Sequence, residues 1–211
     1  MTKLVDFPKI ESPFIREMIN KNYVVTPNIT ENMNWVFEDM NVLAVEKIHG
    51  TCCAIVIENG VVIAMFNRTN RIPFIGGTLS KALTEGVNNA LAKDRFTMMD
   101  GIYWGELIGP KVQKNDYQLE EHEWLPFEWM RTHLAYNSWH KYPKTFENIN
   151  NWFMNPIEEG GIFSLFMKKK GVNQSPEGVV FTHPETGQMA KLRRDMFSDY
   201  KGPRHNDHTI I

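Results

Sequence analysis

The chain contains 211 residues, enough for one large domain or for one domain with a small appendage. With 42% hydrophobic residues, 12% aromatic residues and a formal net charge of −2, it has the composition of a folded protein, which excludes disordered and collagen-like chains. Its apolar runs are far shorter than the roughly 18 residues of a membrane helix, and its start lacks the apolar core of a signal peptide, so we expect a cytoplasmic protein.

Cysteine and charge patterns narrow the chemistry further. The two cysteines, Cys52 and Cys53, are neighbours, so they form no disulfide framework, and no CxxC or HExxH spacing supplies the other ligands of a zinc site. Residues 161–211 carry eight Lys or Arg against five Asp or Glu, whereas residues 1–160 have a net charge of −5. Such a locally basic region can bind phosphate groups although the whole chain is slightly acidic.

In chain order, the first predicted element is a short helix over Pro13–Lys21, because Ser12-Pro13 is a typical helix start and an apolar stripe follows it. Next, two strands over Thr51–Ile57 and Val61–Phe66 should form a hairpin. Asn59-Gly60 between them supplies the positive φ angles that a two-residue turn requires.

Strands dominate the rest of the chain, with helices inserted between them. The remaining predicted elements are a helix over residues 78–94, strands over Gly101–Ile108 and Trp124–Met130, a helix within residues 144–155, and a hairpin of Gly178–Thr182 with Gln188–Leu192. No GxGxxG or P-loop follows a predicted strand, which disfavours a dinucleotide-binding Rossmann fold. We therefore predict an α+β fold with antiparallel β-sheets and flanking helices, in a single domain over residues 1–211.

Four short segments place charged side chains at or beside the ends of predicted strands. They are EKIHGT (46–51), GELIGP (105–110), SPEGVVF (175–181) and AKLRRD (190–195). Partial burial can make the amine of Lys47 a nucleophile, and Gly50 lets a ligand approach the backbone closely. Together with the carboxylates and cations of the other segments, this lysine suits a nucleoside triphosphate. Taken singly, each segment is also an ordinary solvated strand end.

In this order along the chain, Lys-x-His-Gly, GELIGP, EGVV and the late Lys-x-basic element resemble four motifs of the covalent nucleotidyltransferases, which are ATP-dependent RNA and DNA ligases and mRNA capping enzymes. The segments EKIHG and GELIGPKVQKN most resemble the phage-type RNA ligase 2 family. The resemblance spans Val42 to Phe197. It implies the nucleotidyltransferase (ATP-grasp-like) domain of ligases.

The resemblance also implies roles for individual residues. Lys47 would be the catalytic residue that carries AMP, and His49 would matter for steps beyond lysine adenylylation. The nucleotide-binding residues would be Glu46 at the adenine edge, Arg68 at the ribose, Glu106 at the ribose or the metal site, Phe127 stacked on adenine, Glu177 as the metal ligand, and Lys191 and Arg193 at the α-phosphate. Without the motif context, Phe127 would be read as a core aromatic.

The implied reaction uses ATP and Mg²⁺ and has three steps. Lys47 becomes lysyl-AMP, AMP moves to the 5′-phosphate of RNA, and a 3′-hydroxyl then displaces AMP to seal the strand. DNA or an RNA–DNA hybrid are further candidate substrates. The open alternatives are a small DNA nick ligase, an RNA 5′-adenylyltransferase and a non-catalytic nucleic-acid-binding module. Capping-type guanylyl transfer is disfavoured, because relatives that use GTP usually have aspartate at the position of His49.

The sequence also departs from the family pattern. Arg193 and Thr182 stand where relatives can carry lysine. Sixteen residues follow Asp195, so we expect no separate C-terminal nucleic-acid-binding domain. His205 and His208 are interpreted as part of a polar tail rather than as metal ligands. Lysine adenylylation is therefore better supported than strand sealing.

Overall fold

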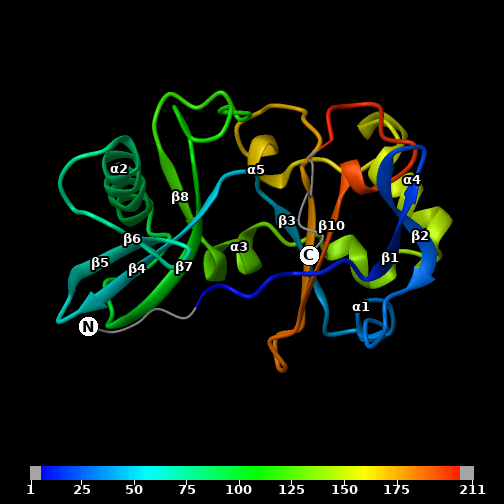
Figure 1. Ribbon diagram of the computed structural model, residues 1–211, viewed down its shortest axis with the longest axis horizontal. Coiled ribbons are helices and arrows are strands. Elements are labelled where there is room, and N and C mark those ends of the chain that lie inside the picture. The colour runs from blue at the N-terminus through cyan, green and yellow to red at the C-terminus, as the bar shows by residue number, and fades with distance from the viewer. Residues whose placement is uncertain (1–5, 205–211) are drawn as a thin grey trace. The chain divides into compact units, whose positions relative to one another are not determined.

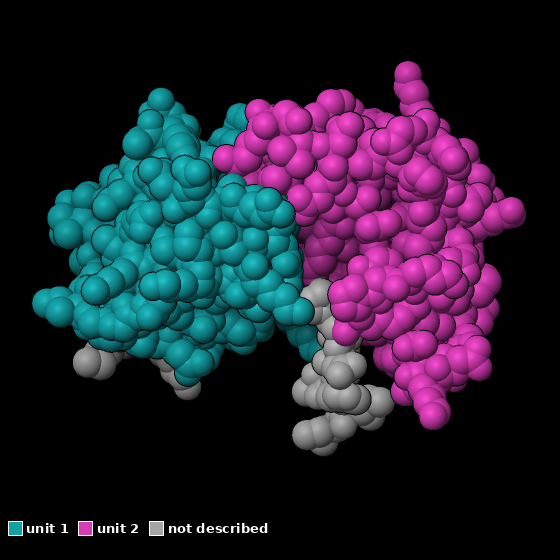
Figure 2. Space-filling model, turned by 90° about the horizontal axis from the view of Figure 1, so that it is seen from above, with its two compact units in different colours: residues 1–9, 48–133 teal, residues 10–47, 134–211 magenta. Residues whose placement is uncertain are grey.

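The computed structural model describes residues 6–204. The chain forms two compact units, which are drawn in different colours in Figure 2. Unit 1 comprises residues 1–9 and 48–133, and unit 2 comprises residues 10–47 and 134–211. Each unit is therefore assembled from separate stretches of sequence. That residues 1–211 act as one nucleotidyltransferase domain stays a prediction.

Unit 1 is built on a five-stranded antiparallel sheet with the strand order β6-β5-β4-β7-β8. Its elements are β4 (Thr51–Glu58), β5 (Val61–Asn67), β6 (Asn70–Ile72), α2 (Thr78–Ala92), β7 (Gly101–Ile108), β8 (Glu123–Pro126) and α3 (Phe127–His133). Helix α2 lies on one face of the sheet (Figure 1), where its buried Leu83 and Ala90 share a core with Leu107 and Trp124. The predicted β4–β5 hairpin and the predicted helix α2 are confirmed.

Unit 2 contains a three-stranded antiparallel sheet with the order β10-β9-β3 and a separate β1–β2 hairpin. Its strands are β1 (Phe14–Ile19), β2 (Asn22–Ile29), β3 (Leu43–Lys47), β9 (Gly178–Thr182) and β10 (Met189–Arg193). Its helices are α1 (Trp35–Glu38), α4 (Phe146–Met154) and α5 (Leu165–Lys168), with 3-10 turns at Asn137–Lys141, Ile157–Glu159 and Arg194–Met196. The predicted helix within residues 144–155 and the predicted β9–β10 hairpin are confirmed.

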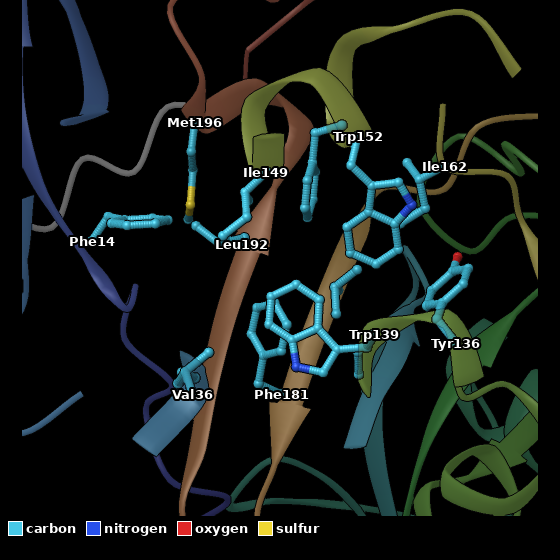
Figure 3. Close-up of a cluster of buried hydrophobic side chains, with 14 of the residues drawn as sticks. Phe14, Val36, Tyr136, Trp139, Ile149, Trp152, Ile162, Phe181, Leu192 and Met196 are labelled. Atoms are coloured by element: carbon cyan, nitrogen blue, oxygen red, sulfur yellow. The ribbon is translucent and has the colours of Figure 1, made fainter. Parts of the chain in front are cut away.

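An aromatic cluster forms the core of unit 2 (Figure 3). Trp139 stacks on Trp152 with 5.7 Å between ring centroids and lies 4.7 Å from Phe181 of β9. Phe14 and Val36 enter the same core from segments that precede β3 in the sequence. Because side chains alternate along a strand, only one face of the three-stranded sheet contributes to this core. The opposite face is available for polar residues.

Two predicted elements are wrong in whole or in part. The Pro13–Lys21 segment is a strand, β1, and not a helix, because the β-branched run of β2 pairs with it across a turn at Asn20 and Lys21. Both turn residues have positive φ, 50° and 65°, which suits a tight hairpin. The predicted strand Trp124–Met130 ends at Pro126, which has no N–H for a further ladder bond, and helix α3 follows.

The α+β fold with antiparallel sheets is confirmed. Between residues 6 and 204, no helix has the length and apolar character needed to cross a membrane.

Candidate active site

Lys47 is the last residue of β3, and its side chain forms an ion pair. Its Nζ lies 2.7 Å from Oε2 of Glu177, which directly precedes β9. Strand pairing explains this contact, because Lys47 is opposite Gly178 in the β3–β9 register. The backbone of Glu177 is fixed in turn, since its carbonyl accepts a hydrogen bond from the N–H of Arg194 at 2.9 Å. Two residues that the resemblance placed at one site are therefore in contact within unit 2.

The two predicted phosphate-binding cations lie on the same sheet face as Lys47. In the β9–β10 register, Arg193 is opposite Gly178 and Lys191 is opposite Val180, and residues directly opposite each other in a sheet share a face. Arg193 is only 6% exposed, and its Nε donates to Oδ1 of Asp195 at 2.9 Å. Asp195 thus balances the charge of Arg193 inside unit 2. The roles of Lys191 and Arg193 at the α-phosphate stay predictions.

Glu46 points to the core face of the sheet, opposite to Lys47, and is fully buried. Its Oε1 accepts a hydrogen bond from Ser164 Oγ at 2.5 Å, and its Oε2 accepts one from the N–H of Phe166 at 2.9 Å. Burial raises the pKa of Glu46 from 4.5 to about 7, although the hydrogen bonds from Ser164 and Phe166 act in the opposite direction. Within unit 2 this side chain fastens β3 to the start of α5. Its contact with the adenine edge stays a prediction.

In unit 1, the segment that follows Lys47 is held by Glu106. The Oε1 of Glu106 accepts a hydrogen bond from the N–H of Gly50 at 3.0 Å. Glycine is required at position 50, because a Cβ there would lie 2.3 Å from the carbonyl oxygen of Leu107. The close approach of these two backbones therefore places the Glu106 carboxylate at the end of the nucleophile motif. Its role at the ribose or the metal stays a prediction.

Arg68 and Phe127 both contact the N-terminal segment of unit 1. Arg68, at the turn between β5 and β6, donates from Nη2 to Asp6 Oδ2 at 3.0 Å and to the carbonyl of Phe7 at 3.1 Å. The ring of Phe7 lies 4.9 Å from the ring of Phe127 and 5.4 Å from that of Trp104. Arg68 and Phe127, which the resemblance placed at the ribose and the adenine, thus both contact one short segment of unit 1, Asp6-Phe7.

Sequence reasoning missed several polar partners of the motif residues. His49 Nδ1 lies 2.5 Å from Oδ2 of Asp116, and the N–H of His49 donates to the hydroxyl of Tyr117 at 2.8 Å. Asp195 and Ser164 were missed as well. Asp116 and Tyr117 occupy a loop whose residues follow neither strand nor helix periodicity, so no pattern pointed to them. The one available signal was that they directly follow GELIGPKVQKN.

A divalent metal ion needs several oxygen ligands, some of which can come from carboxylates. Over residues 6–204, no three or more His, Cys, Asp or Glu side chains are grouped so that they could hold a metal ion by themselves. Mg²⁺ commonly binds through one or two carboxylates together with substrate phosphates, and Glu177 can supply one such carboxylate. His205 and His208 lie outside the described residues.

Comparison with known proteins gives a family and a set of distant structural matches. A comparison with curated proteins finds no match. Among solved structures, Naegleria gruberi RNA ligase with pyrophosphate is 15% identical, with a TM-score of 0.46 over 89% of this chain and 61% of its own. A point mutant of that ligase with ATP and Mn is 13% identical, with a TM-score of 0.44 over 87% of this chain and 59% of its own. This chain therefore spans about three fifths of the length of those structures.

The family model described as RNA ligase matches residues 40–194. The matched range contains Lys47, Glu106, Glu177 and Arg193, and it draws on both units. The match covers well over half of the 211 residues. The chain therefore belongs to the RNA ligase family.

Proposed function

We propose that the chain is an ATP-dependent RNA ligase that reacts through lysyl-AMP at Lys47. The observation that carries this proposal is the 2.7 Å contact between Lys47 Nζ and the Glu177 carboxylate, inside the range that matches the RNA ligase family. A lysine at the end of a strand with a carboxylate against its amine has both a nucleophile and a proton acceptor. The partly buried position of the pair limits competition from water, since the two side chains are 21% and 11% exposed.

In the first step, the Nζ of Lys47 attacks the α-phosphorus of ATP. The nitrogen–phosphorus bond forms while the bond from that phosphorus to the bridging oxygen breaks, and pyrophosphate leaves. The amine proton passes to the Glu177 carboxylate or to water. Glu177 would hold Mg²⁺, and that ion would supply positive charge to offset the charge of the phosphates.

In the second and third steps, AMP moves to RNA and is then displaced. An oxygen of the RNA 5′-phosphate attacks the AMP phosphorus, the bond to Lys47 breaks, and the lysine nitrogen takes up a proton. A 3′-hydroxyl then attacks the 5′-phosphate, loses its proton and releases AMP. Lys191 and Arg193 are assigned to the α-phosphate, where cationic groups stabilise the charge of the transition state.

The nucleotide is assigned further contacts by the same resemblance. We assign Phe127 to adenine stacking, Glu46 to the adenine edge, and Arg68 and Glu106 to the ribose. The substrate is RNA with 5′-phosphate and 3′-hydroxyl ends, with DNA or an RNA–DNA hybrid as the alternatives to be tested. A phage-like role in RNA repair in the cytoplasm is the physiological setting that fits this activity.

The first test is covalent labelling of the full chain. Incubation with α-phosphate-labelled ATP and Mg²⁺ should leave label on the denatured protein, and peptide mass spectrometry should place one AMP at Lys47. Lys47→Ala should lose the label, whereas Lys81→Ala, an exposed lysine on α2, should keep it. Absence of adenylate from the wild-type protein would overturn the proposal.

The second test identifies the nucleic acid. Matched RNA and DNA with 5′-phosphates, offered as single strands and as nicked duplexes, should show joining of RNA ends. Closure of DNA nicks alone would contradict the RNA assignment. Accumulation of 5′-adenylylated RNA without joining would favour the RNA 5′-adenylyltransferase.

A further inference from the structure

The loop between β7 and β8, residues 109–122, has a fixed shape of its own. Backbone hydrogen bonds of 3.0 Å from Asn115 to Val112 and of 2.8 Å from Gln118 to Asn115 close successive turns within it. The side chain of Asn115 adds a bond of 3.0 Å to the carbonyl of Leu119. Tyr117 is only 4% exposed, so the loop also has a buried anchor. It can therefore hold another segment in place.

The segment that this loop holds is His49-Gly50, the last two residues of the Lys-x-His-Gly motif. The hydroxyl of Tyr117 accepts from the N–H of His49 at 2.8 Å, and the side-chain amide of Gln113 donates to the carbonyl of Gly50 at 3.1 Å. These two bonds fix the backbone. Asp116 adds the contact to the side chain, with 2.5 Å between its Oδ2 and Nδ1 of the imidazole.

The held segment lies close to the proposed reacting atom along the chain. Only Ile48 separates His49 from Lys47, and two residues span at most about 7 Å of backbone. A carboxylate on Nδ1 keeps a proton on that nitrogen and fixes the orientation of the ring. The other ring nitrogen, Nε2, is then a hydrogen-bond acceptor in a defined direction. An imidazole held in this way offers one defined hydrogen-bonding group, two residues along the chain from the lysine that takes up AMP in the first proposed step and gives it up in the second.

We propose that Asp116 is a positioning residue for adenylyl transfer, which it serves by fixing the tautomer and orientation of the His49 ring. This inference rests on the proposed function. Asp116 does not need to touch the nucleotide for this purpose. The side chains of His49 and Asp116 are 20% and 39% exposed, and a side-chain contact with this much exposure contributes little to folding stability. A loss of activity without a loss of stability is therefore the expected signature.

Rates measured for each step test the proposal in the full chain. The variants are Asp116→Ala, Asp116→Asn, His49→Ala and the double variant, and the matched control is Glu120→Ala, which removes a carboxylate from an exposed position of the same loop. Adenylylation of Lys47 and transfer of AMP to 5′-phosphorylated RNA are timed separately. We expect Asp116→Ala to slow at least one step about 10- to 100-fold, as loss of a partner that orients a histidine commonly does. Asp116→Asn, which keeps an oxygen acceptor, should recover part of that rate.

The double variant separates positioning from a general structural effect. If Asp116 acts through His49, adding Asp116→Ala to His49→Ala should change the slowed step by less than about 2-fold, since the partner is already gone. Multiplicative losses, a wild-type rate for Asp116→Ala or a wild-type rate for His49→Ala would each overturn the proposal. The melting temperature of Asp116→Ala should stay within about 3 °C of the wild type.

A spectroscopic measurement reports on the contact without relying on activity. In protein labelled with ¹⁵N-histidine, the His49 ring signals are identified by their absence from His49→Ala. Asp116→Ala should shift them toward a mixed tautomer, whereas Glu120→Ala should leave them unchanged. If the wild-type protein takes up no adenylate at Lys47, the proposed function has failed and this inference fails with it. If adenylylation proceeds but the His49 signals ignore Asp116→Ala, only this inference fails.

Discussion

Lys47 and Glu177 are 130 residues apart in the sequence, yet they form one ion pair because β3 and β9 are neighbours in the sheet. The motif resemblance predicted both residues individually, but the contact depends on strand register, which no local pattern reveals. Partners such as Asp116 and Ser164 could not be predicted, because an isolated polar residue in a loop or at a helix start leaves no periodic signal. At this scale, motif residues were predictable from the sequence and their partners were not.

The buried carboxyl of Glu46 predicts a pH dependence of stability. Burial raises its pKa in the folded protein to about 7, whereas the unfolded chain ionises near 4.5. The folded state therefore holds the proton more tightly, and the stability present below pH 4.5 is lost as the pH rises through about 7. From pH 5 to pH 8, we expect the free energy of unfolding to fall by roughly 2–3 kcal/mol more in the wild type than in Glu46→Gln.

Urea denaturation of both proteins at these two pH values checks the prediction, because Gln cannot ionise and other titrating groups cancel in the comparison. Parallel pH profiles for wild type and Glu46→Gln would contradict it.

Among the secondary-structure elements, hairpins and amphipathic helices were predictable because their signals are local. Asn59-Gly60 fixed the β4–β5 turn, with φ values of 52° and 70°, and the apolar spacing of α2 matched its buried face. The β1 segment was predicted as a helix, because Ser12-Pro13 resembles a helix start and the turn at Asn20-Lys21 lacks the glycine that marks the β4–β5 turn. A local helix signal therefore outweighed a hairpin turn of unusual composition.

Gly178 sets how closely β9 and β10 approach in the sheet that carries Lys47. A Cβ at this position would lie 2.1 Å from the carbonyl oxygen of Leu192 and 2.7 Å from Cα of Arg193. Gly178→Ala should therefore separate the strands and lower the free energy of unfolding by about 2–3 kcal/mol. Adenylylation of Lys47 should slow as well, because residue 178 lies opposite it.

Gly187→Asn, in the turn of the same hairpin, is the matched control. Its φ of 71° suits asparagine, and a Cβ there meets no atom within 4 Å. The free energies of unfolding of the two variants and the wild type are compared by denaturation. Equal stability of Gly178→Ala and the wild type would show that β9 and β10 do not approach as closely at Gly178 as described.

The contact of the N-terminal segment with Arg68 predicts an effect on nucleotide affinity. Asp6 and Arg68 are 42% and 49% exposed, so their ion pair should add little to stability. If Arg68 contacts the ribose as proposed, its ion pair with Asp6 competes with that contact. Asp6→Asn should weaken the ion pair and lower the KM for ATP in the adenylylation reaction about 2- to 5-fold. Asp94→Asn removes the same charge elsewhere in unit 1 and should leave KM unchanged. A KM for Asp6→Asn equal to or above that of wild type would count against this prediction.

For the whole molecule, composition predicted a folded chain and the order of strands and helices predicted the α+β class, but neither revealed two interleaved units. Within the described residues, 6–9 fold with 48–133, and 10–47 fold with 134–204. No change in composition marks these boundaries in the sequence. Such an arrangement follows from tertiary packing and is absent from any local sequence pattern.

The matched family range, residues 40–194, should not fold stably when produced alone. It lacks Phe14, Val25, Val36, Met196 and Phe197, which are all at most 4% exposed in the core of unit 2. Burial of each large apolar side chain is worth about 2 kcal/mol, and a whole domain has only about 5–15 kcal/mol of net stability. Circular dichroism during heating should therefore show a cooperative transition for the full chain and none for residues 40–194. A sharp transition at the same temperature would show that the flanking core residues are dispensable.

The interleaving also determines how the protein responds to a protease. The chain passes between the units at residues 9–10, 47–48 and 133–134. A nick at the second passage yields two fragments, and each of them still contains parts of both units. Neither unit can be released as a single polypeptide, so the nicked protein should stay associated on a native gel and separate only on a denaturing one. The nick would leave Lys47 on the shorter fragment and His49 on the longer one, which allows the two halves of the motif to be exchanged between differently mutated molecules.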